Sequence, residues 1–372
     1  MCCLFKTHQL DTAIRSTTPS NFGTSRVPSF ASGVDYVIRS SNGGTDFEFE
    51  TSPVHGLASE LYSGTVAEGS SQMGSNITGH VVEGLQLFSR EELLAATNNF
   101  SLRNKIGVGS FGVVYGGLLG DGREVAIKRN ETSSKMKEFQ KLVFGYLVTF
   151  LRRLHHEHLV GLVGFCEEKD EKLLVYEYMK NGSVYDHLHQ KGSVVLNSWK
   201  MRIKIALDAS RGIEYLHDYA GTNIWRDIKS SNILLDDTWR ARVSDFGLSS
   251  LMKAVGTMID PECYGVYVLK AKSEVYAFGV VLLELLTGKT PILCGEDGGT
   301  PLSVVEYAVP PILAGDLAKI LDARVGAPHV NEAKAVELVA YTAIHSVNLE
   351  GKERPSLAEI VVNLERAFGY YL

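Results

Sequence analysis

The distribution of apolar and polar residues separates a long polar stretch from a patterned remainder. Residues 1–86 are rich in Ser, Thr, Gly and Asn and present no periodic apolar face. A segment of this composition buries too little apolar surface to offset the entropy that is lost on ordering. The pattern therefore predicts a disordered tail over residues 1–86.

A helix signal follows the polar stretch. Ser89 and Glu92 have the spacing of a capping box, and Phe88 and Leu93 have that of a hydrophobic staple. Both motifs mark the start of a helix. They predict a lead-in helix within residues 87–100 that runs toward Thr97, and they place the beginning of the folded part there.

Strand signals dominate residues 101–179. Val113–Tyr115 is β-branched and aromatic, and Gly120-Asp121-Gly122 is a turn sequence ahead of a further strand. Leu173–Met179 begins as an apolar run and ends in a polar segment. The pattern predicts a hairpin with a third strand beside it, and later a buried strand that leads into a connection.

Helix signals dominate residues 180–372. Ser273–Thr287 is apolar enough for a buried central helix, and Leu357–Phe368 has amphipathic spacing. Ser356 and Glu359 supply a second capping box. A strand-rich part followed by a helix-rich part indicates the α+β class.

Composition narrows the functional classes. The net charge of −6 and the isoelectric point of about 6.0 give no reason to expect a nucleic-acid partner. No apolar run reaches the roughly 18 residues of a membrane-spanning helix. The cysteines lack the paired spacing of a zinc site or a disulfide framework, which suits the reducing cytosol. They are Cys2, Cys3, Cys166, Cys263 and Cys294.

The strongest chemical signal is a group of polar residues between 227 and 247. Asp227 is followed by Lys229 and Asn232, and then by Asp245 within Asp-Phe-Gly. These are the residue types that orient a hydroxyl, a triphosphate and magnesium for phosphoryl transfer. Asp227 would accept the hydroxyl proton and Lys229 would lie near the phosphoryl group. Asn232 and Asp245 would bind Mg²⁺, with Mn²⁺ as an alternative, through oxygen ligands.

A polar turn followed by an unrelated Asp-Phe-Gly is the alternative interpretation, and three further motifs in the required order argue against it. The first is a glycine loop, Gly107, Gly109 and Gly112, followed by Lys128. The same glycine spacing opens dinucleotide-binding folds, but there a helix follows directly, whereas here a strand does. The loop therefore predicts a hairpin flap over phosphates. Its predicted nucleotide-binding residues are Ile106, Gly107, Val108, Gly109, Ser110, Phe111, Gly112, Val114, Ala126 and Lys128.

The second motif is the segment where the strand-rich and helix-rich parts join. We expect Tyr176 to border the back of a nucleotide pocket, and Glu177 and Met179 to offer a main-chain carbonyl and amide to the base. Leu234 would form the floor of that pocket. An apolar run of this kind is also compatible with an ordinary buried core.

The third motif pairs Glu262, in Asp260-Pro261-Glu262, with Arg354 far downstream. Such a Glu and Arg can form a buried ion pair that fixes the end of the segment after Asp-Phe-Gly. Two residues this far apart in sequence do not by themselves indicate an ion pair, and the prediction depends on the presence of the other motifs.

Several segments resemble the plant receptor-like Ser/Thr kinases of the Pelle/IRAK type, and among them the Crinkly-related receptor-like kinases. They are Phe88–Ser101, Leu154–Cys166 and Gly279–Gly288, together with Lys229 in the loop after Asp227. The resemblance covers about residues 88–369. It implies a two-lobed protein kinase fold, with a small N-lobe over 101–179 and a larger helical C-lobe over 180–372. Lys229 implies a serine or threonine acceptor.

The resemblance also implies cofactors, partners and a location. ATP and Mg²⁺ would be the cofactors, and protein substrates would include the chain itself or a co-receptor kinase. The tail over residues 1–86 would be juxtamembrane-like and cytoplasmic, at the inner face of the plasma membrane. A missing N-terminal region, or acylation of Cys2 and Cys3, would provide the attachment.

Three departures from the family pattern leave two functions open. Leu147 stands where the family has a glutamate that pairs with Lys128, in an apolar segment with Gly145 that fits an amphipathic helix poorly. Trp225 replaces a histidine beside the catalytic loop, and the activation segment between Gly247 and Asp260 is short. An active Ser/Thr kinase is favoured by the presence of Lys128, Asp227, Asn232 and Asp245. The departures favour a nucleotide-binding scaffold that transfers phosphate poorly. A small-molecule kinase is a more distant third hypothesis.

Overall fold

The chain divides into two units, Met1–Asn76 and Ile77–Leu372. The computed structural model describes residues 37–40, 47–50, 81–82, 84–109, 112–129, 144–145, 147–168, 171–190, 193–220, 225–247, 271–293 and 300–372. In the first unit, strand β1 (Val37–Ser40) pairs antiparallel with β2 (Phe47–Glu50). All other described elements belong to the second unit.

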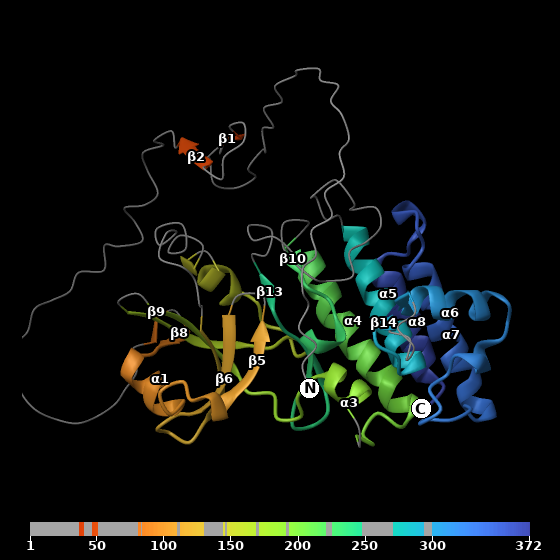
Figure 1. Ribbon diagram of the computed structural model, residues 1–372, viewed down its shortest axis with the longest axis horizontal. Helices are drawn as coiled ribbons and strands as arrows, with labels where there is room; N and C mark the ends of the chain where they lie inside the picture. Colours follow the sequence, from red (N-terminus) through yellow and green to blue (C-terminus); the bar gives the residue numbers. More distant parts are fainter. Residues whose placement is uncertain are drawn as a thin grey trace, which may run out of the picture. The chain divides into compact units, whose positions relative to one another are not determined.

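The strand-rich part of the second unit is a seven-stranded sheet, in the order β3-β4-β8-β9-β7-β6-β5. Its pairs are antiparallel except for β4 and β8, which run parallel. Figure 1 shows these strands in orange and yellow. Their bounds are β3 Val81–Val82, β4 Leu85–Leu87, β5 Lys105–Gly109, β6 Gly112–Leu118, β7 Glu124–Arg129, β8 Leu162–Glu168 and β9 Glu171–Glu177.

The sheet begins earlier in the chain than the sequence pattern predicts. Strand β4 starts at Leu85, inside the stretch that we expected to be a tail, and Leu85 is buried. The strand lies so close to β8 that a Cβ added to Gly164 would meet Gln86 O at 2.0 Å. Three residues are too few to show an alternating pattern, because a strand this short depends on its neighbour rather than on local propensity.

The lead-in helix forms as predicted. Helix α1 (Arg90–Ala96) starts with a capping box between Ser89 and Glu92. Phe88 and Leu93 are buried in one apolar cluster with the sheet. The helix is followed by residues 98–100, whose φ angles of 50–55° lie in the left-handed region. Such a run in non-glycine residues persists where surrounding contacts fix it, and here Phe100 N donates to Thr97 Oγ1 at 3.1 Å.

The two faces of strand β7 have different environments, and this positions the site. Val125 and Ile127 are fully buried against α1 and the sheet core. Ala126 and Lys128 point to the opposite face, because successive side chains of a strand alternate, and both are half-buried. The predicted nucleotide-binding residues of β7 therefore share one face.

Among its described residues, the helix-rich part contains the six helices α3 to α8 and three small strand pairs. Helix α4 packs against α8, and α5 packs against α7; Figure 1 draws them in green to blue. The helices are α3 Val184–His189, α4 Trp199–Ala220, α5 Ala271–Thr287, α6 Val304–Leu313, α7 Val330–Ser346 and α8 Leu357–Gly369. The strand pairs are β10 Trp225–Arg226 with β13 Phe246–Gly247, β11 Ile233–Leu235 with β12 Ala241–Val243, and β14 Ile292–Leu293 with β15 Leu302–Ser303. Short 3₁₀ turns are η1 Leu102–Asn104, η4 Ser230–Asn232, η7 Leu317–Lys319 and η8 Gly351–Glu353.

Two predicted helices of this part are confirmed. Helix α5 is buried along nearly its whole length, and α8 begins with the capping box of Ser356 and Glu359. Within the part of the chain that the structure describes, no helix is both long enough and apolar enough to cross a membrane.

The segment around Leu147 is helical, although its composition argued against an amphipathic helix. Residues 144–145 and 147–151 are helical, and Phe144, Val148 and Leu151 are buried in the main core. These positions follow the i, i+4, i+7 spacing of one helix face. Burial of that face outweighs the poor propensity of Gly145 and of the β-branched residues, because tertiary packing supplies most helix stability in proteins.

A buried ion cluster fixes the base of the helical part. Arg202 Nη2 lies 2.6 Å from Asp322 Oδ2, and both side chains are almost fully buried. Arg202 also donates to the main-chain oxygens of Leu196 at 2.6 Å and Leu285 at 2.7 Å. Arg324 donates to the same carboxylate at 2.6 Å. Burial disfavours ionisation of Asp322, but the hydrogen bonds from Arg324 and Arg202 outweigh it and lower the pKa of Asp322 to about 2 from 3.8.

Because the pKa of Asp322 is lowered in this cluster, we expect the fold to become less stable at acidic pH. A carboxyl whose folded pKa lies below its unfolded value stabilises the fold fully above the unfolded pKa and loses that contribution as the pH falls through the folded pKa. The shift corresponds to about 2 kcal/mol at neutral pH, lost as the pH falls below 3.8 toward 2. Urea unfolding at a series of pH values should show that Asp322→Asn removes this acid-dependent part. Asp316→Asn, at the exposed pair with Lys319, should leave it unchanged; equal curves for native and Asp322→Asn chains would contradict the prediction.

Candidate active site

A short strand pair brings the two catalytic motifs together. β10 and β13 pair with Trp225 opposite Gly247 and Arg226 opposite Phe246. The residues that follow and precede these strands, Asp227 and Asp245, therefore start from neighbouring positions. The pairing forms with Trp225 in place of the family's histidine, so the backbone of the loop keeps its register there.

Hydrogen bonds close the loop that carries the catalytic residues. Asn232 Nδ2 donates to Asp227 O at 2.7 Å, and Asn232 N donates to Lys229 O at 2.9 Å. On the other side, Ser244 N and Ser244 Oγ both donate to Asn232 O, at 2.8 and 2.9 Å. Asn232 thus connects the base-like residue to the residue directly ahead of Asp245.

Asp227 and Lys229 form a partly enclosed ion pair. Lys229 Nζ lies 2.5 Å from Asp227 Oδ2, and the side chains are 38% and 11% exposed respectively. A charged hydrogen bond of this kind holds an acceptor oxygen in a fixed direction. The ion pair therefore holds Asp227, the predicted general base, next to Lys229, the predicted phosphate-binding cation.

Lys128 reaches from the sheet to the helix-rich part. Its Nζ donates to Asp245 Oδ1, and both side chains are about one-tenth exposed. Asp245 has a φ of 57°, a left-handed conformation that costs free energy and is concentrated at functional sites. Burial and the nearby Asp245 carboxylate raise the pKa of the Tyr176 phenol. Tyr176 lies on β9 opposite Ala126 of β7, and its expected place behind a nucleotide stays a prediction.

Leu147 is half-buried and packs against the main core. The family's glutamate would offer Lys128 a carboxylate from this helix, and leucine offers none. In this structure Lys128 instead contacts the carboxylate that is predicted to bind metal.

The glycine loop is a β-hairpin, as the sequence predicts. β5 and β6 pair antiparallel with Gly109 opposite Gly112, and the intervening Ser110 and Phe111 lie outside the described residues. Val114 lies opposite Lys128, and Gly116 opposite Ala126. Ile106 and Val108 are 50% and 69% exposed, so the hairpin presents apolar side chains that a bound base could cover. Gly107 lies between them.

The segment that connects the sheet to the helix-rich part has only some of its main-chain groups available for hydrogen bonds to an adenine base. Glu177 N donates to Gly161 O at 3.0 Å, and the Glu177 side chain accepts from Arg242 at 2.8 Å. This leaves the Glu177 carbonyl and the Met179 amide as the predicted adenine contacts. Leu234 is half-buried on β11, which bridges to Ser183.

Arg354 is buried and held by main-chain oxygens. It donates to Asn348 O at 2.7 Å and Lys272 O at 2.8 Å, and its guanidinium lies 4.9 Å from the ring centre of Tyr276. Glu262, its predicted partner, lies outside the described residues, so the ion pair stays a prediction.

The oxygen donors fit a nucleotide-bound Mg²⁺ rather than a protein-made metal cage. Asp245 and Asn232 provide a carboxylate and an amide oxygen, which are hard ligands. The described ranges contain no group of three or more His, Cys, Asp or Glu side chains that could hold a metal ion. Mg²⁺ needs no such group when phosphates and water complete its shell.

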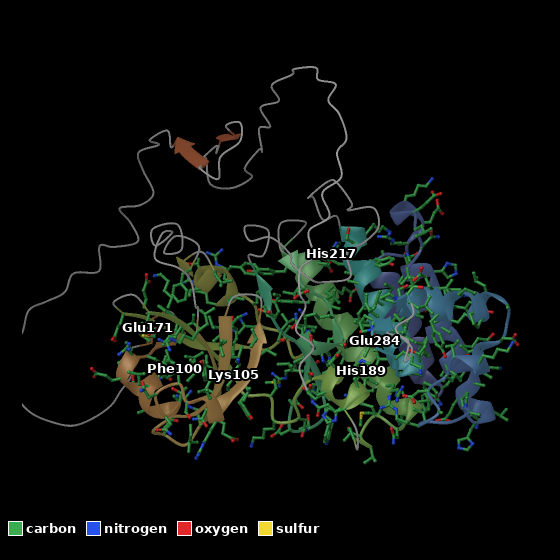
Figure 2. The ribbon with its side chains drawn as sticks, in the orientation of Figure 1. Phe100, Lys105, Glu171, His189, His217 and Glu284 are labelled. Atoms are coloured by element: carbon green, nitrogen blue, oxygen red, sulfur yellow. The ribbon has the colours of Figure 1, made fainter. Side chains whose placement is uncertain are left out.

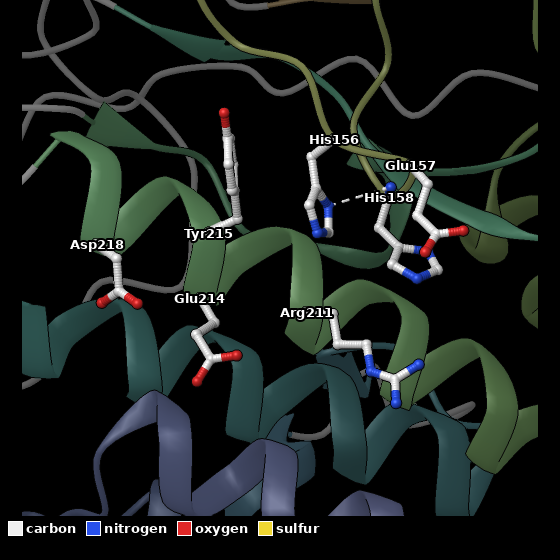
Figure 3. Close-up of a pocket in the computed structure, with 7 residues that line it drawn as sticks. All are labelled: His156, Glu157, His158, Arg211, Glu214, Tyr215 and Asp218. Atoms are coloured by element: carbon white, nitrogen blue, oxygen red, sulfur yellow. Dashed lines mark hydrogen bonds between the residues drawn. The ribbon is translucent and has the colours of Figure 1, made fainter.

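A separate surface pocket of about 330 Å³ lies on helix α4, and none of the predicted site residues lines it. Figure 3 shows its lining. His156 stacks on Tyr215 with ring centres 4.8 Å apart, and His158 Nδ1 lies 3.1 Å from Ala241 O. Burial lowers the pKa of both histidines. Neutral, packed imidazoles indicate a structural junction between α4 and the loop ahead of β8.

One contact to the loop after Asp227 involves two residues to which the sequence motifs assign no role. Ser230 Oγ donates to Glu284 Oε2 at 2.8 Å. The sequence does contain a signal for it, since Glu284 is the sole carboxyl in the apolar run Val275–Thr287 of α5.

Comparison with known proteins agrees with this geometry. The family described as protein tyrosine and serine/threonine kinase matches residues 100–364. The chain is 59% identical over 310 residues to a serine/threonine-protein kinase-like protein, CCR3, of Arabidopsis thaliana, covering 75% of this chain and 38% of that protein. It is 47% identical over 307 residues to the serine/threonine-protein kinase-like protein CCR4 of the same plant, covering 76% and 41%. It is 38% identical to the proline-rich receptor-like protein kinase PERK12, also from Arabidopsis thaliana, covering 75% and 40%.

The chain thus spans about two fifths of the length of these relatives. The range matched by the family, residues 100–364, contains strands β5 to β9 of the sheet, the loop after Asp227 and helices α3 to α7. The chain therefore belongs to the protein tyrosine and serine/threonine kinase family, and within it to the Crinkly-related plant receptor-like kinases.

Proposed function

We propose that this domain is an ATP-dependent protein serine/threonine kinase. The proposal rests on one connected set of contacts: Lys128 to Asp245, Asp245 through Ser244 to Asn232, and Asn232 to Asp227 with its partner Lys229. Side chains from three separated motifs thereby meet at one place. That arrangement suits phosphoryl transfer, in which positioning and charge supply most of the catalysis.

The residues then have distinct roles. Asp227 accepts the proton of a serine or threonine hydroxyl while the oxygen of that hydroxyl forms a bond to the γ-phosphorus of ATP. At the same time, the bond from this phosphorus to the ADP oxygen breaks. Lys229 balances charge on the transferred group, and Lys128 binds the remaining phosphates. When bound, Mg²⁺, or Mn²⁺ as an alternative, neutralises phosphate charge. Asp245 and Asn232 would hold it.

Phosphate transfer by the purified chain tests this function. With ATP and Mg²⁺, the chain should phosphorylate itself or a generic protein substrate, and phosphoamino-acid analysis should find phosphoserine or phosphothreonine. Chelation of the divalent ion should abolish the signal. Phosphotyrosine alone would contradict the proposed acceptor class, and absence of transfer would contradict the enzyme itself.

A nucleotide-binding scaffold is the second candidate. The observations that favour it are Leu147 in place of the glutamate and the contact between Lys128 and the metal-binding carboxylate. ATP should then raise the melting temperature of the chain without any phosphate transfer. No shift with or without Mg²⁺ would exclude both candidates.

We further propose that the domain acts at the inner face of the plasma membrane, on protein substrates that include itself or a co-receptor kinase. The support is the similarity of the chain to receptor-like protein kinases, PERK12 among them. Cys2 and Cys3, the candidate acylation sites, lie outside the described residues. Palmitate labelling of the native chain, compared with a Cys2→Ser/Cys3→Ser variant, tests the attachment.

A further inference from the structure

A buried carboxyl on α5 touches the catalytic loop from outside the set of predicted site residues. The Glu284 side chain is 1% exposed. Its Oε2 accepts from Ser230 Oγ at 2.8 Å and lies 3.0 Å from His189 Nε2, which donates to it from α3. Figure 2 labels Glu284 and His189 side by side. Three elements, α3, η4 and α5, thus meet at one oxygen atom.

Glu284 is poorly explained as a contributor to stability. Its other oxygen, Oε1, is buried and has no hydrogen-bond partner among the described residues. Burial raises the pKa of Glu284, although the hydrogen bonds from His189 and Ser230 oppose this. The neighbouring Leu283 and Leu285 are buried and apolar. Replacing a buried polar group together with its partners by apolar residues often leaves a fold as stable or makes it more stable, so a buried carboxyl with one unsatisfied oxygen calls for another role.

The contacts of Ser230 suggest that role. Ser230 follows Lys229 directly and opens η4, which ends at Asn232. The bonds of Asn232 to Asp227 and Lys229 close the loop upon itself. They do not attach it to the helices beneath. The Ser230 hydroxyl does join the loop to α5, through Glu284.

His189 provides the second side of the attachment. It is the last residue of α3, and its ring lies edge-on to Tyr185 at 4.5 Å between centres. Helix α3 contacts η4 and β11, and Ser183, which caps α3, bridges to Leu234 of the predicted nucleotide floor. A shift of α3 would therefore reach the loop through Glu284.

We propose that Glu284 is a positioning residue for phosphoryl transfer: it accepts hydrogen bonds from Ser230 and His189 and so fixes the catalytic loop, with Asp227 and Lys229, against α5 and α3. This inference rests on the proposed kinase function. Glu284 does not touch substrate or nucleotide in this role, and it acts through Ser230.

The test compares turnover with stability in the full chain. Glu284→Leu should lower kcat for phosphate transfer about tenfold, because misplacement of a reacting group is costly. It should also lower the melting temperature, because the buried Ser230 and His189 donors lose their shared acceptor. Ser230→Ala should lower kcat by a similar factor with an unchanged KM for ATP. Glu284→Gln, which keeps an acceptor oxygen, should stay within about threefold of the native kcat. Ser210→Ala, which removes a buried hydroxyl that donates to Leu207 O on α4, is the matched control and should change neither quantity.

Two further results decide the mechanism. The double variant Ser230→Ala/Glu284→Leu should be no slower than the slower single variant, since both changes break one connection. Amide hydrogen exchange of residues 228–233 should accelerate in Ser230→Ala and Glu284→Leu, and not in Ser210→Ala. This readout needs no phosphate transfer, so it tests the attachment even if the native chain is inactive. Additive losses in kcat, or unchanged exchange in both variants, would overturn the proposal.

Discussion

Replacing Asp227 with asparagine should lower kcat for phosphate transfer by about 10³-fold, because a positioned general base contributes factors of this order. Asparagine has nearly the same shape, but its amide cannot accept the hydroxyl proton. It also leaves Lys229 without the carboxylate that lies 2.5 Å from its Nζ. The measurement is steady-state transfer to a protein substrate at saturating ATP.

The shape of the site should survive this change. The loop bond from Asn232 uses the main-chain oxygen of residue 227, so stabilisation by ATP in a thermal-shift titration should remain. Asp237→Asn makes the same chemical change at an exposed position in the β11–β12 turn and should leave kcat unchanged. If the Asp227→Asn chain transferred phosphate as fast as the native chain, Asp227 would not be the base.

Introducing a glutamate at Leu147 should raise kcat about tenfold, which corresponds to about 1.4 kcal/mol in the activation free energy. Leu147 lies in the helical residues 147–151, at the position where the resemblance implies a glutamate. A carboxylate there would offer Lys128 a further partner, and a charge-assisted hydrogen bond contributes about 1.5–3 kcal/mol. Asp245 would then be released to bind metal. The measurement is kcat at a series of Mg²⁺ concentrations, and the half-saturating concentration should fall.

Two control variants distinguish the effect of an ion pair with Lys128 from the effects of side-chain size and of an added charge alone. Leu147→Gln has the size of glutamate without its charge, and Thr149→Glu adds a carboxylate to the exposed face of the same helix. Neither should raise kcat. A glutamate at position 147 that left both kcat and the Mg²⁺ dependence unchanged in a folded chain would show that the missing pair does not limit the reaction.

Local patterns predicted much of this fold. The capping boxes of Ser89 and Ser356 are confirmed because their determinants lie within four residues of sequence. The hairpin β5–β6 and helix α5 likewise follow from nearby signals. Strand β4 was missed since its order depends on β8, some eighty residues downstream.

In the candidate site, too, local sequence patterns predicted some features, whereas contacts between distant residues could not be predicted. The motifs indicated that Lys128, Asp227, Asn232 and Asp245 belong to one site, and the structure connects them. They could not indicate which carboxylate Lys128 contacts, because Asp245 is 117 residues away in sequence and the choice depends on how the lobes pack. Glu284 escaped notice for a related reason. Its importance lies in Ser230, a partner that no spacing rule links to it.

The close approach of Gln86 to Gly164 has a mechanical consequence. Strand β4 follows the edge strand β3 and pairs with β8 in parallel orientation. Tension on β4 would therefore load its hydrogen bonds to β8 in shear, and the sheet would carry the force before it reached the catalytic loop. A larger residue at position 164 would push β4 aside and weaken this mechanical joint while leaving the phosphate-transfer residues intact.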